Sequence, residues 1–174
     1  MSAFPDEYDA PLETMWEGRF VAARRRGKWE FAGRTRGIRA AVIIAEVDGE
    51  VLLVEQYRVP LGTRCLELPA GLIGDDGVGE TVAAAAAREL EEETGYRAGR
   101  IEVIGDFHAS PGMLSESFTL VRAHDVVRVS DGGGVAGEAI TVHRVRRADV
   151  PSFMAARRAE GVAMDVKLLG LLSI

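Results

Sequence analysis

Residues 74–96 constrain the fold of this chain more than any other stretch, because they join a strong helix-forming run to a dense set of carboxylates. Five successive alanines, at 83–87, have the highest intrinsic helix propensity, so an α-helix is predicted there. At about 100° per residue, such a helix separates its polar and apolar side chains into two sectors. The carboxylate sector holds Glu89, Glu92 and Glu93, and the apolar sector holds Ala83, Ala86, Ala87, Leu90 and Thr94.

A cluster of like charges lowers the stability of a helix. Carboxylates three or four residues apart repel each other by roughly 0.2–0.5 kcal/mol per pair, and the helix macrodipole disfavours anions near the C-terminus. A bound cation would offset both effects. Mg²⁺ binds one or two carboxylates together with waters and substrate phosphate oxygens, so the helix predicts a divalent metal site. A solvated charged face is the alternative interpretation of any glutamate-rich helix.

The spacing within this stretch favours the metal site. Gly74 is followed after five residues by Glu80, after seven more by Arg88-Glu89-Leu90, and then by Glu92-Glu93 and Gly95-Tyr96. This order fills every fixed position of the Nudix box, and the chain therefore resembles the Nudix hydrolases. The resemblance implies cleavage of a nucleoside diphosphate linked to another moiety, with divalent metal held by the box.

The same resemblance implies a set of metal ligands. They are the main-chain carbonyl of Ala70 and the carboxylates of Glu89, Glu92 and Glu93, which would hold two or three Mg²⁺ (or Mn²⁺) ions. Arg88 is expected to keep the glutamates in register, and Glu80 to orient them. Pro69-Ala70-Gly71 lies three residues earlier than the box requires, which indicates a lengthened loop between Gly71 and Glu80. No metal role is expected for His108, His124 or His143, which do not cluster in the sequence.

Length and composition indicate one globular domain. A chain of 174 residues can bury its own core, so residues 13–174 are expected to form one domain after a flexible N-terminal arm at 1–12. The net charge of -6 argues against nucleic acid as a partner. Cys65, the single cysteine, is predicted to be a small buried hydrophobe in a reducing compartment. The sequence shows no signal peptide and no run of about eighteen apolar residues, so a cytoplasmic protein without a membrane partner is expected.

Alternating and apolar runs predict the remaining elements. Within 13–37, two extended segments at 16–25 and 28–36 flank Arg26-Gly27 and predict an antiparallel hairpin. Strands at 41–47 and 51–57 flank Asp48-Gly49, a dipeptide typical of a type I′ turn. Further strands are expected at 65–68, 101–107, 117–129 and 140–145, with loops at 108–114 and 131–138 and closing helices at 150–158 and 164–172.

This order of elements predicts an α/β (α+β) fold in which helices cover both faces of a mixed β-sheet. The prediction agrees with the α/β/α sandwich that the Nudix resemblance implies, with the N-terminal antiparallel hairpin as an addition.

Features outside the box resemble the ADP-ribose (ADP-sugar) pyrophosphatase subgroup. Pro111 lies sixteen residues after Gly95 and precedes Ser115-Glu116, although it could also be an ordinary loop proline. The order of Trp29-Glu30, Arg34 and Arg58 is also similar to that subgroup, and implies that Trp29 stacks on adenine while the arginines bind the diphosphate or ribose. A sheet aromatic and a strand-end charge are the alternative interpretations of Trp29 and Arg58. The resemblance further implies a homodimer, in which the N-terminal hairpin contributes to the partner's site.

Glu138 follows a glycine-rich loop and precedes an apolar strand. A glutamate at the matching position of ADP-ribose pyrophosphatases implies a role as the base, or as the group that orients the attacking water. A box glutamate such as Glu92 is the alternative base. General-base assistance increases a rate by about 10²- to 10⁴-fold.

The resemblance therefore implies a hydrolase that converts ADP-ribose and water to AMP and ribose 5-phosphate. The sequence leaves two alternatives open. One is a pyrophosphatase for another nucleoside diphosphate sugar, namely ADP-glucose, UDP-glucose or GDP-mannose. The other is a Nudix-fold sensor that binds its ligand without cleaving it.

Overall fold

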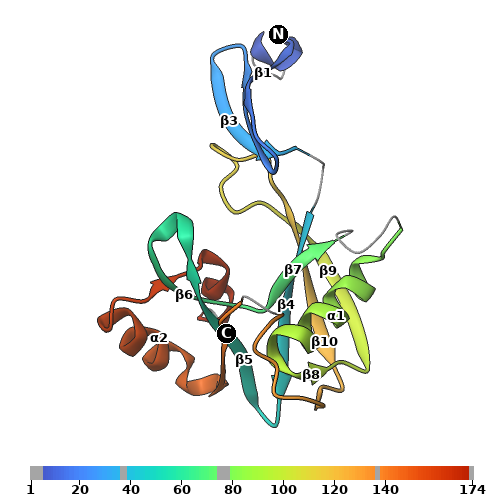
Figure 1. The fold of residues 1–174 in the computed structure, drawn as a ribbon, viewed down its shortest axis with the longest axis vertical. Coiled ribbons are helices and arrows are strands. Elements are labelled where there is room, and N and C mark those ends of the chain that lie inside the picture. Colours follow the sequence, from blue (N-terminus) through green and yellow to red (C-terminus); the bar gives the residue numbers. More distant parts are fainter. Residues whose placement is uncertain (1–5, 36–38, 74–78, 136–137, 173–174) are drawn as a thin grey trace.

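Two apolar strands form the centre of the fold (Figure 1). In this computed structural model, which describes residues 6–35, 39–73, 79–135 and 138–172, they are β4 (Arg39–Val47) and β5 (Glu50–Arg58). The turn between them has positive φ at both Asp48 (53°) and Gly49 (77°), as the predicted type I′ turn requires. Beyond this turn the strands pair over only two residue pairs, Glu46 with Val51 and Val47 with Glu50. The rest of β4 and β5 therefore belongs to two diverging groups of strands.

Each diverging strand has its own neighbours. The order of the mixed sheet is β13-β6-β5-β4-β10-β9, with β12 also paired to β5 and β7 also paired to β4. The pairs β4–β10 and β6–β13 are parallel, and the other pairs are antiparallel. The bounds of these strands are β6 (Thr63–Glu67), β7 (Ala70–Ile73), β9 (Arg100–Phe107), β10 (Phe118–His124), β12 (Thr141–Arg146) and β13 (Ala163–Met164).

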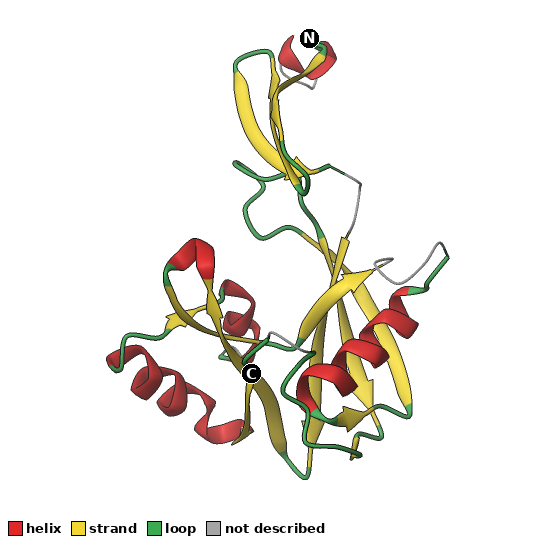
Figure 2. Cartoon of the chain, viewed as in Figure 1, coloured by secondary structure: helices red, strands yellow, loops and turns green. Residues whose placement is uncertain are grey.

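Helices cover the two faces of this sheet (Figure 2). Because side chains alternate along a strand, Ile43 and Leu52 pack with Leu90 of α1 (Val82–Thr94) on one face. Their neighbours Val42 and Leu53 pack on the other face, in a cluster with residues of α2 (Val150–Ala159) and of the 3₁₀ helix η4 (Val166–Leu171). The α/β/α arrangement and the mixed sheet predicted from the sequence are confirmed.

The N-terminal region forms a separate three-stranded antiparallel sheet that projects from the body (Figure 1). Its strands are β1 (Leu12–Glu17), β2 (Val21–Arg26) and β3 (Trp29–Arg34), after a short 3₁₀ helix η1 (Asp6–Asp9). The hairpin expected at Arg26-Gly27 is confirmed as the β2–β3 connection. The expected strand at 16–25 is wrong in extent, since a turn at Gly18 separates β1 from β2. β1 is exposed along its whole length and therefore lacks the alternation that marks a strand in sequence.

Two other predictions need correction, and one strand was not predicted. The strand expected at 117–129 is broken at Asp125, whose φ of 54° ends β10 before the short β11 (Val127–Arg128) pairs with β8 (Tyr96–Arg97). β7 was not expected. The closing helix expected at 164–172 is instead β13 followed by η4, because Met164 pairs with Leu66 and the Asp165 side chain caps η4.

The remaining short elements are η2 (Val59–Leu61) and η3 (Arg147–Asp149). The lengthened loop predicted before α1 lies largely outside the described residues. No helix within the described ranges is long and apolar enough to cross a lipid bilayer.

Candidate active site

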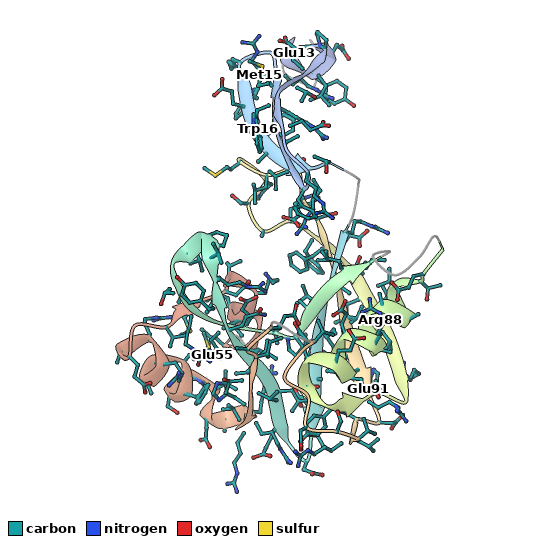
Figure 3. The ribbon with its side chains drawn as sticks, in the orientation of Figure 1. Glu13, Met15, Trp16, Glu55, Arg88 and Glu91 are labelled. Atoms are coloured by element: carbon teal, nitrogen blue, oxygen red, sulfur yellow. The ribbon has the colours of Figure 1, made fainter. Side chains whose placement is uncertain are left out.

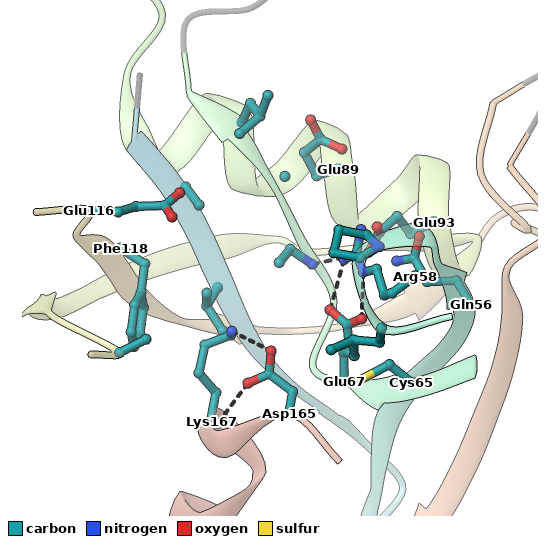
Figure 4. Close-up of a pocket in the computed structure, with 18 of the residues that line it drawn as sticks. Gln56, Arg58, Cys65, Glu67, Glu89, Glu93, Glu116, Phe118, Asp165 and Lys167 are labelled. Atoms are coloured by element: carbon teal, nitrogen blue, oxygen red, sulfur yellow. Dashed lines mark hydrogen bonds and ion pairs between the residues drawn. The ribbon is translucent and has the colours of Figure 1, made fainter. Parts of the chain in front are cut away.

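The divergence of β4 and β5 opens a cleft of about 680 Å³ (Figure 4). Its walls come from both groups of strands, from α1 and from the start of η4. The predicted site residues that line it are Arg34, Arg58, Ala70, Glu89, Glu93, Glu116 and Glu138. The topology therefore brings together residues that are more than 100 positions apart in the sequence, from Arg34 to Glu138.

Local sequence fixes the ends of α1. Thr81 caps its N-terminus, where the side chain accepts a hydrogen bond from the backbone N–H of Ala84 at 3.2 Å. Gly95 ends it in the left-handed conformation, with φ of 77°, and its N–H donates to the carbonyl of Glu91. Between these caps, Glu89 and Glu93 lie one turn apart on the side that faces β7 and the cleft.

Gly71 of β7 allows α1 to approach the strand closely. A Cβ atom at this position would lie 1.9 Å from Cδ of Glu89. Any larger residue would therefore displace the Glu89 carboxylate. Gly71 thus has a steric role at the cleft.

Glu93 is buried, with 6% of its surface exposed, and its Oε2 accepts a hydrogen bond from the backbone N–H of Ala70 at 3.0 Å. Burial raises the pKa of Glu93 to about 8, the Ala70 N–H opposes this shift, and the charges of Glu89 and Glu138 add to it. The pKa of Glu89 is also raised, first by burial, although neighbouring Arg88 lowers it. Burial is thus the main reason that the pKa values of both carboxylates are raised.

Arg88 forms ion pairs with three glutamates. Its guanidinium lies 3.2 Å from Glu80, 3.0 Å from Glu89 and 3.0 Å from Glu92. Glu92 does not line the cleft, and its side chain is 37% exposed. The three carboxylates predicted for one sector therefore divide: Glu89 and Glu93 line the cleft, whereas Glu92 does not and pairs with Arg88.

The donor set at the cleft fits a hard divalent cation. Glu89 and Glu93 provide carboxylate oxygens at the cleft, and burial is the first cause of their raised pKa values. Mg²⁺ typically takes one or two carboxylates and completes its shell with waters and phosphate oxygens. In the described part of the chain, no group of three or more His, Cys, Asp or Glu side chains is arranged to hold a metal ion. A metal at Glu89 and Glu93 would thus need further oxygen ligands from main chain, water or substrate.

A guanidinium lies close to these carboxylates. Arg58 donates two hydrogen bonds to Glu67, at 2.6 and 2.7 Å, in a bidentate pair. The pKa of Arg58 is raised first by this pair, and the charge of Glu93 contributes as well. The side chain of Arg58 is 42% exposed at the cleft while that of Glu67 is 6% exposed. Arg58 therefore presents a fixed positive charge beside Glu93.

A second ion pair connects the N-terminal sheet to the body. Arg34 donates to Glu116 at 2.8 Å. The backbone of Ala32 holds this arrangement, because its N–H donates to Met113 at 3.0 Å and its carbonyl accepts from Ser115 at 2.9 Å. Arg34 and Glu116, both predicted to bind substrate, are thus neighbours on the cleft.

The remaining predicted residues lie outside the cleft of the single chain. Arg88 and Glu92 lie on the outer side of α1, and Pro111 lies in the loop that leads to Leu114. Trp29 and Glu30 lie at the end of β3 next to the β2–β3 turn, away from the body, and Trp29 is 51% exposed. Of these five residues, all in the described part of the chain, only Arg88 contacts a glutamate of the cleft, through its ion pair with Glu89 at 3.0 Å.

Sequence reasoning missed one wall of the cleft. Lys167 lies over the ring of Phe118, with its Nζ 5.5 Å from the ring centroid, and Asp165 accepts a hydrogen bond from the Lys167 N–H at 2.7 Å. All three residues line the cleft opposite α1 (Figure 4). The only local signal was Asp165 at a position that can cap a helix. Cys65, predicted to be buried, is 3% exposed on this wall, and burial raises its pKa to about 12.

Comparisons with known proteins agree with this geometry. A family model described as the NUDIX domain matches residues 35–160. The chain is 41% identical over 86 residues to an ADP-ribose pyrophosphatase of Bacillus subtilis (49% of this chain, 45% of that protein). It is 32% identical over 147 residues to a GDP-mannose pyrophosphatase of Cronobacter sakazakii (79% and 72%).

The fold also matches a solved structure, the crystal structure of an ADP compounds hydrolase. The TM-score is 0.68 at 25% identity, over 93% of this chain and 89% of the other. The chain spans about half the length of several of the curated relatives that it matches.

Proposed function

The chain belongs to the NUDIX domain family, and from this premise we propose that it hydrolyses the diphosphate of a nucleoside diphosphate sugar. The proposed reaction converts ADP-ribose and water to AMP and ribose 5-phosphate. The observation that carries the proposal is that the buried carboxylate of Glu93, the half-buried carboxylate of Glu89 and the guanidinium of Arg58 line one cleft. The carboxylates can hold a metal cation, and the guanidinium can bind an anion. A diphosphate can be bound by both a metal cation and a guanidinium.

We propose the following roles for the residues of the cleft. Glu89 and Glu93 hold the metal, with the Ala70 carbonyl as a further ligand, and Arg88 keeps Glu89 in position. When bound, Mg²⁺ or Mn²⁺, as two or three ions, neutralises phosphate oxygens and acidifies water. Arg58 binds the diphosphate. Glu138 lines the same cleft and accepts the proton of the attacking water, with Glu92 as the alternative base.

GDP-mannose is the main alternative to ADP-ribose as the substrate. The B. subtilis relative supports ADP-ribose, whereas the GDP-mannose pyrophosphatase matches a larger share of this chain. We therefore keep GDP-mannose as the second candidate substrate. A non-catalytic sensor is disfavoured, because such modules commonly lack box glutamates and this chain has all of them.

The N-terminal sheet supports a homodimer as part of the proposal. In the single chain the N-terminal sheet exposes the large apolar side chains of Met15 and Trp16 (Figure 3), and Phe20 between β1 and β2 is exposed as well. A second copy that covers them could also bring Trp29 and Glu30 to the partner's cleft, where Trp29 would stack on the base. We further propose a cytoplasmic location, which fits a chain with one free, buried cysteine.

A substrate panel tests the proposal. ADP-ribose, ADP-glucose, UDP-glucose and GDP-mannose are each incubated with the protein and Mg²⁺, and the products are identified by chromatography. We expect AMP and ribose 5-phosphate from ADP-ribose, with kcat/KM about tenfold or more above that for the other sugars. A higher kcat/KM for GDP-mannose than for ADP-ribose would identify GDP-mannose as the substrate instead. If none of the four compounds were hydrolysed, the proposed function would be contradicted.

A further inference from the structure

The last carbonyl groups of α1 accept hydrogen bonds from a part of the chain that is distant in sequence. The N–H of Gly133 donates to the carbonyl of Glu93 at 2.8 Å, and the N–H of Gly134 donates to the carbonyl of Glu92 at 3.0 Å. The last carbonyls of a helix have no partners within the helix. Here the glycine segment 132–134 supplies two partners, and one of them bonds to the residue whose side chain lines the cleft.

The fit between the helix end and the glycine segment depends on the absence of side chains. Gly132 has φ of 65°, and a Cβ atom there would lie 2.3 Å from the main-chain carbon of Thr94. A Cβ atom on Gly95 would lie 2.4 Å from the carbonyl oxygen of Ser130. The two backbones therefore touch directly, and neither can tolerate a side chain without moving.

The same segment continues to Glu138. Gly134 has φ of 83°, and a Cβ atom there would lie 2.6 Å from Oε2 and 2.9 Å from Cβ of Glu138. The Glu138 carboxylate accepts a hydrogen bond from the N–H of Val135 at 3.2 Å, and the Glu138 N–H donates to the Val135 carbonyl at 3.0 Å. Glu138 thus packs against Gly134, which is itself bonded to the end of α1.

We propose that the glycine segment 132–134 positions Glu138 relative to Glu93 by fixing its loop to the end of α1. This inference rests on the proposed function, in which Glu138 acts on the attacking water. A reacting group must be held in place closely, since a displacement of about 1 Å can lower a rate by about 10²-fold. The glycines do not touch substrate in this account. They are positioning residues that act through Glu138.

A double-mutant cycle tests this coupling. The variants are Gly134→Ala, Glu138→Ala and the combination, each assayed for kcat and KM with ADP-ribose and Mg²⁺. Glu138→Ala is expected to lower kcat by about 10²-fold or more. Gly134→Ala is expected to lower kcat by about 10- to 100-fold with KM nearly unchanged, because a methyl group there displaces the Glu138 side chain. The combination should be no slower than Glu138→Ala alone, because the two residues act as one unit.

Gly49→Ala is the matched control. Gly49 has φ of 77°, close to that of Gly134, but nothing lies within 4 Å of a Cβ atom built there. The two variants carry similar backbone strain and differ in their contact with Glu138. We expect Gly49→Ala to lower the melting temperature without changing kcat.

Each failure has a distinct result. Unchanged kcat in Glu138→Ala would reject Glu138 as the base. If instead the kcat loss of the double variant equals the product of the two single losses, Gly134 acts independently of Glu138. That result would overturn the inference and leave the proposed function standing. If Gly134→Ala does not fold, Gly133→Ala replaces it, because the nearest atom to its Cβ is 3.8 Å away. Unlike Gly49, Gly133 donates its N–H to the carbonyl of Glu93, and its φ of 103° is strained for alanine, so Gly133→Ala should shift the segment and lower kcat. Unchanged kcat in Gly133→Ala would then count against the inference.

Discussion

The carboxylate of Glu93 accepts a hydrogen bond from the backbone N–H of Ala70 at 3.0 Å, which fixes the buried end of α1 to the first residue of β7. This contact places a titratable side chain at the point where helix and strand meet on the cleft. Because the carboxylate is buried, its protonation is coupled to folding and to metal binding.

The raised pKa of Glu93 predicts a pH dependence of stability in the metal-free protein. Between about pH 4.5, the ordinary pKa, and pH 8, the folded chain retains a proton on Glu93 that the unfolded chain releases. The free energy of unfolding should therefore fall as the pH rises through this window. Thermal unfolding in EDTA at pH 5.5, 6.5, 7.5 and 8.5 measures the effect.

Glu93→Gln provides the comparison for this titration, because it removes the titrating group and keeps the size of the side chain. Its melting temperature should fall less between pH 5.5 and pH 8.5 than that of the wild-type protein. Parallel curves for the two proteins would show that Glu93 does not titrate in this range. Since a metal ion needs the ionised carboxylate, we also expect the affinity for Mn²⁺ to rise with pH up to about pH 8 more steeply in the wild-type protein than in Glu93→Gln.

Gly71→Ala should impair activity for a steric reason. The added methyl group would overlap the Glu89 carboxylate, and displacement of a metal-binding side chain is expected to lower kcat/KM by about 10²-fold. Overpacking should also lower the free energy of unfolding by about 1–3 kcal/mol. Gly112→Ala is the control, because nothing lies within 4 Å of a Cβ atom at Gly112. Equal kcat/KM for the two variants would refute the proposed close approach of β7 and α1.

Glu55 is expected to matter for stability rather than for catalysis. Its side chain is buried and accepts hydrogen bonds from Arg64 at 2.6 Å and from Arg157 at 2.8 and 2.9 Å. Burial alone would raise the pKa of Glu55, but these hydrogen bonds and charges outweigh it and lower the pKa. Because Glu55 does not line the cleft, Glu55→Ala should lower the free energy of unfolding by about 3 kcal/mol and leave KM nearly unchanged.

The exposed pair between Glu46 and Arg147, at 3.1 Å, is the reference for this effect. Glu46→Ala should change the free energy of unfolding by less than about 1 kcal/mol, since exposed ion pairs are screened by solvent. Urea unfolding of both variants measures the difference. If Glu55→Ala proved no less stable than Glu46→Ala, the buried network would contribute nothing.

Local patterns predicted much of this fold because they depend on neighbouring residues. The helix at α1, the Asp48-Gly49 turn and the two central strands each follow from propensity, turn chemistry or apolar runs. β1 was missed as a separate strand because it is exposed throughout and carries no alternation. The separation of Glu92 from Glu93 was also missed, since adjacent residues differ by about 100° on a helix and only tertiary contacts decide which one is buried.

The far wall of the cleft could not be predicted, because it depends on the divergence of β4 and β5. No sequence pattern links the segments that contribute Phe118, Asp165 and Lys167. These residues come together only because the two groups of strands diverge. The positions of Trp29, Glu30 and Pro111 outside the cleft likewise reflect tertiary structure, and for the N-terminal sheet the proposed second copy.

The central claim is that Glu89 and Glu93 bind the metal that hydrolysis requires. Its most direct test is the kcat of ADP-ribose hydrolysis in Mg²⁺ for the wild-type protein, Glu93→Gln and the control Glu91→Gln, with EDTA added afterwards. Glu91 lies on the same helix but pairs with Arg97 at the surface. We predict that Glu93→Gln and EDTA each lower the rate by about 10³-fold or more, while Glu91→Gln stays within about twofold of the wild-type rate. Wild-type turnover by Glu93→Gln, or full activity in EDTA, would contradict the account.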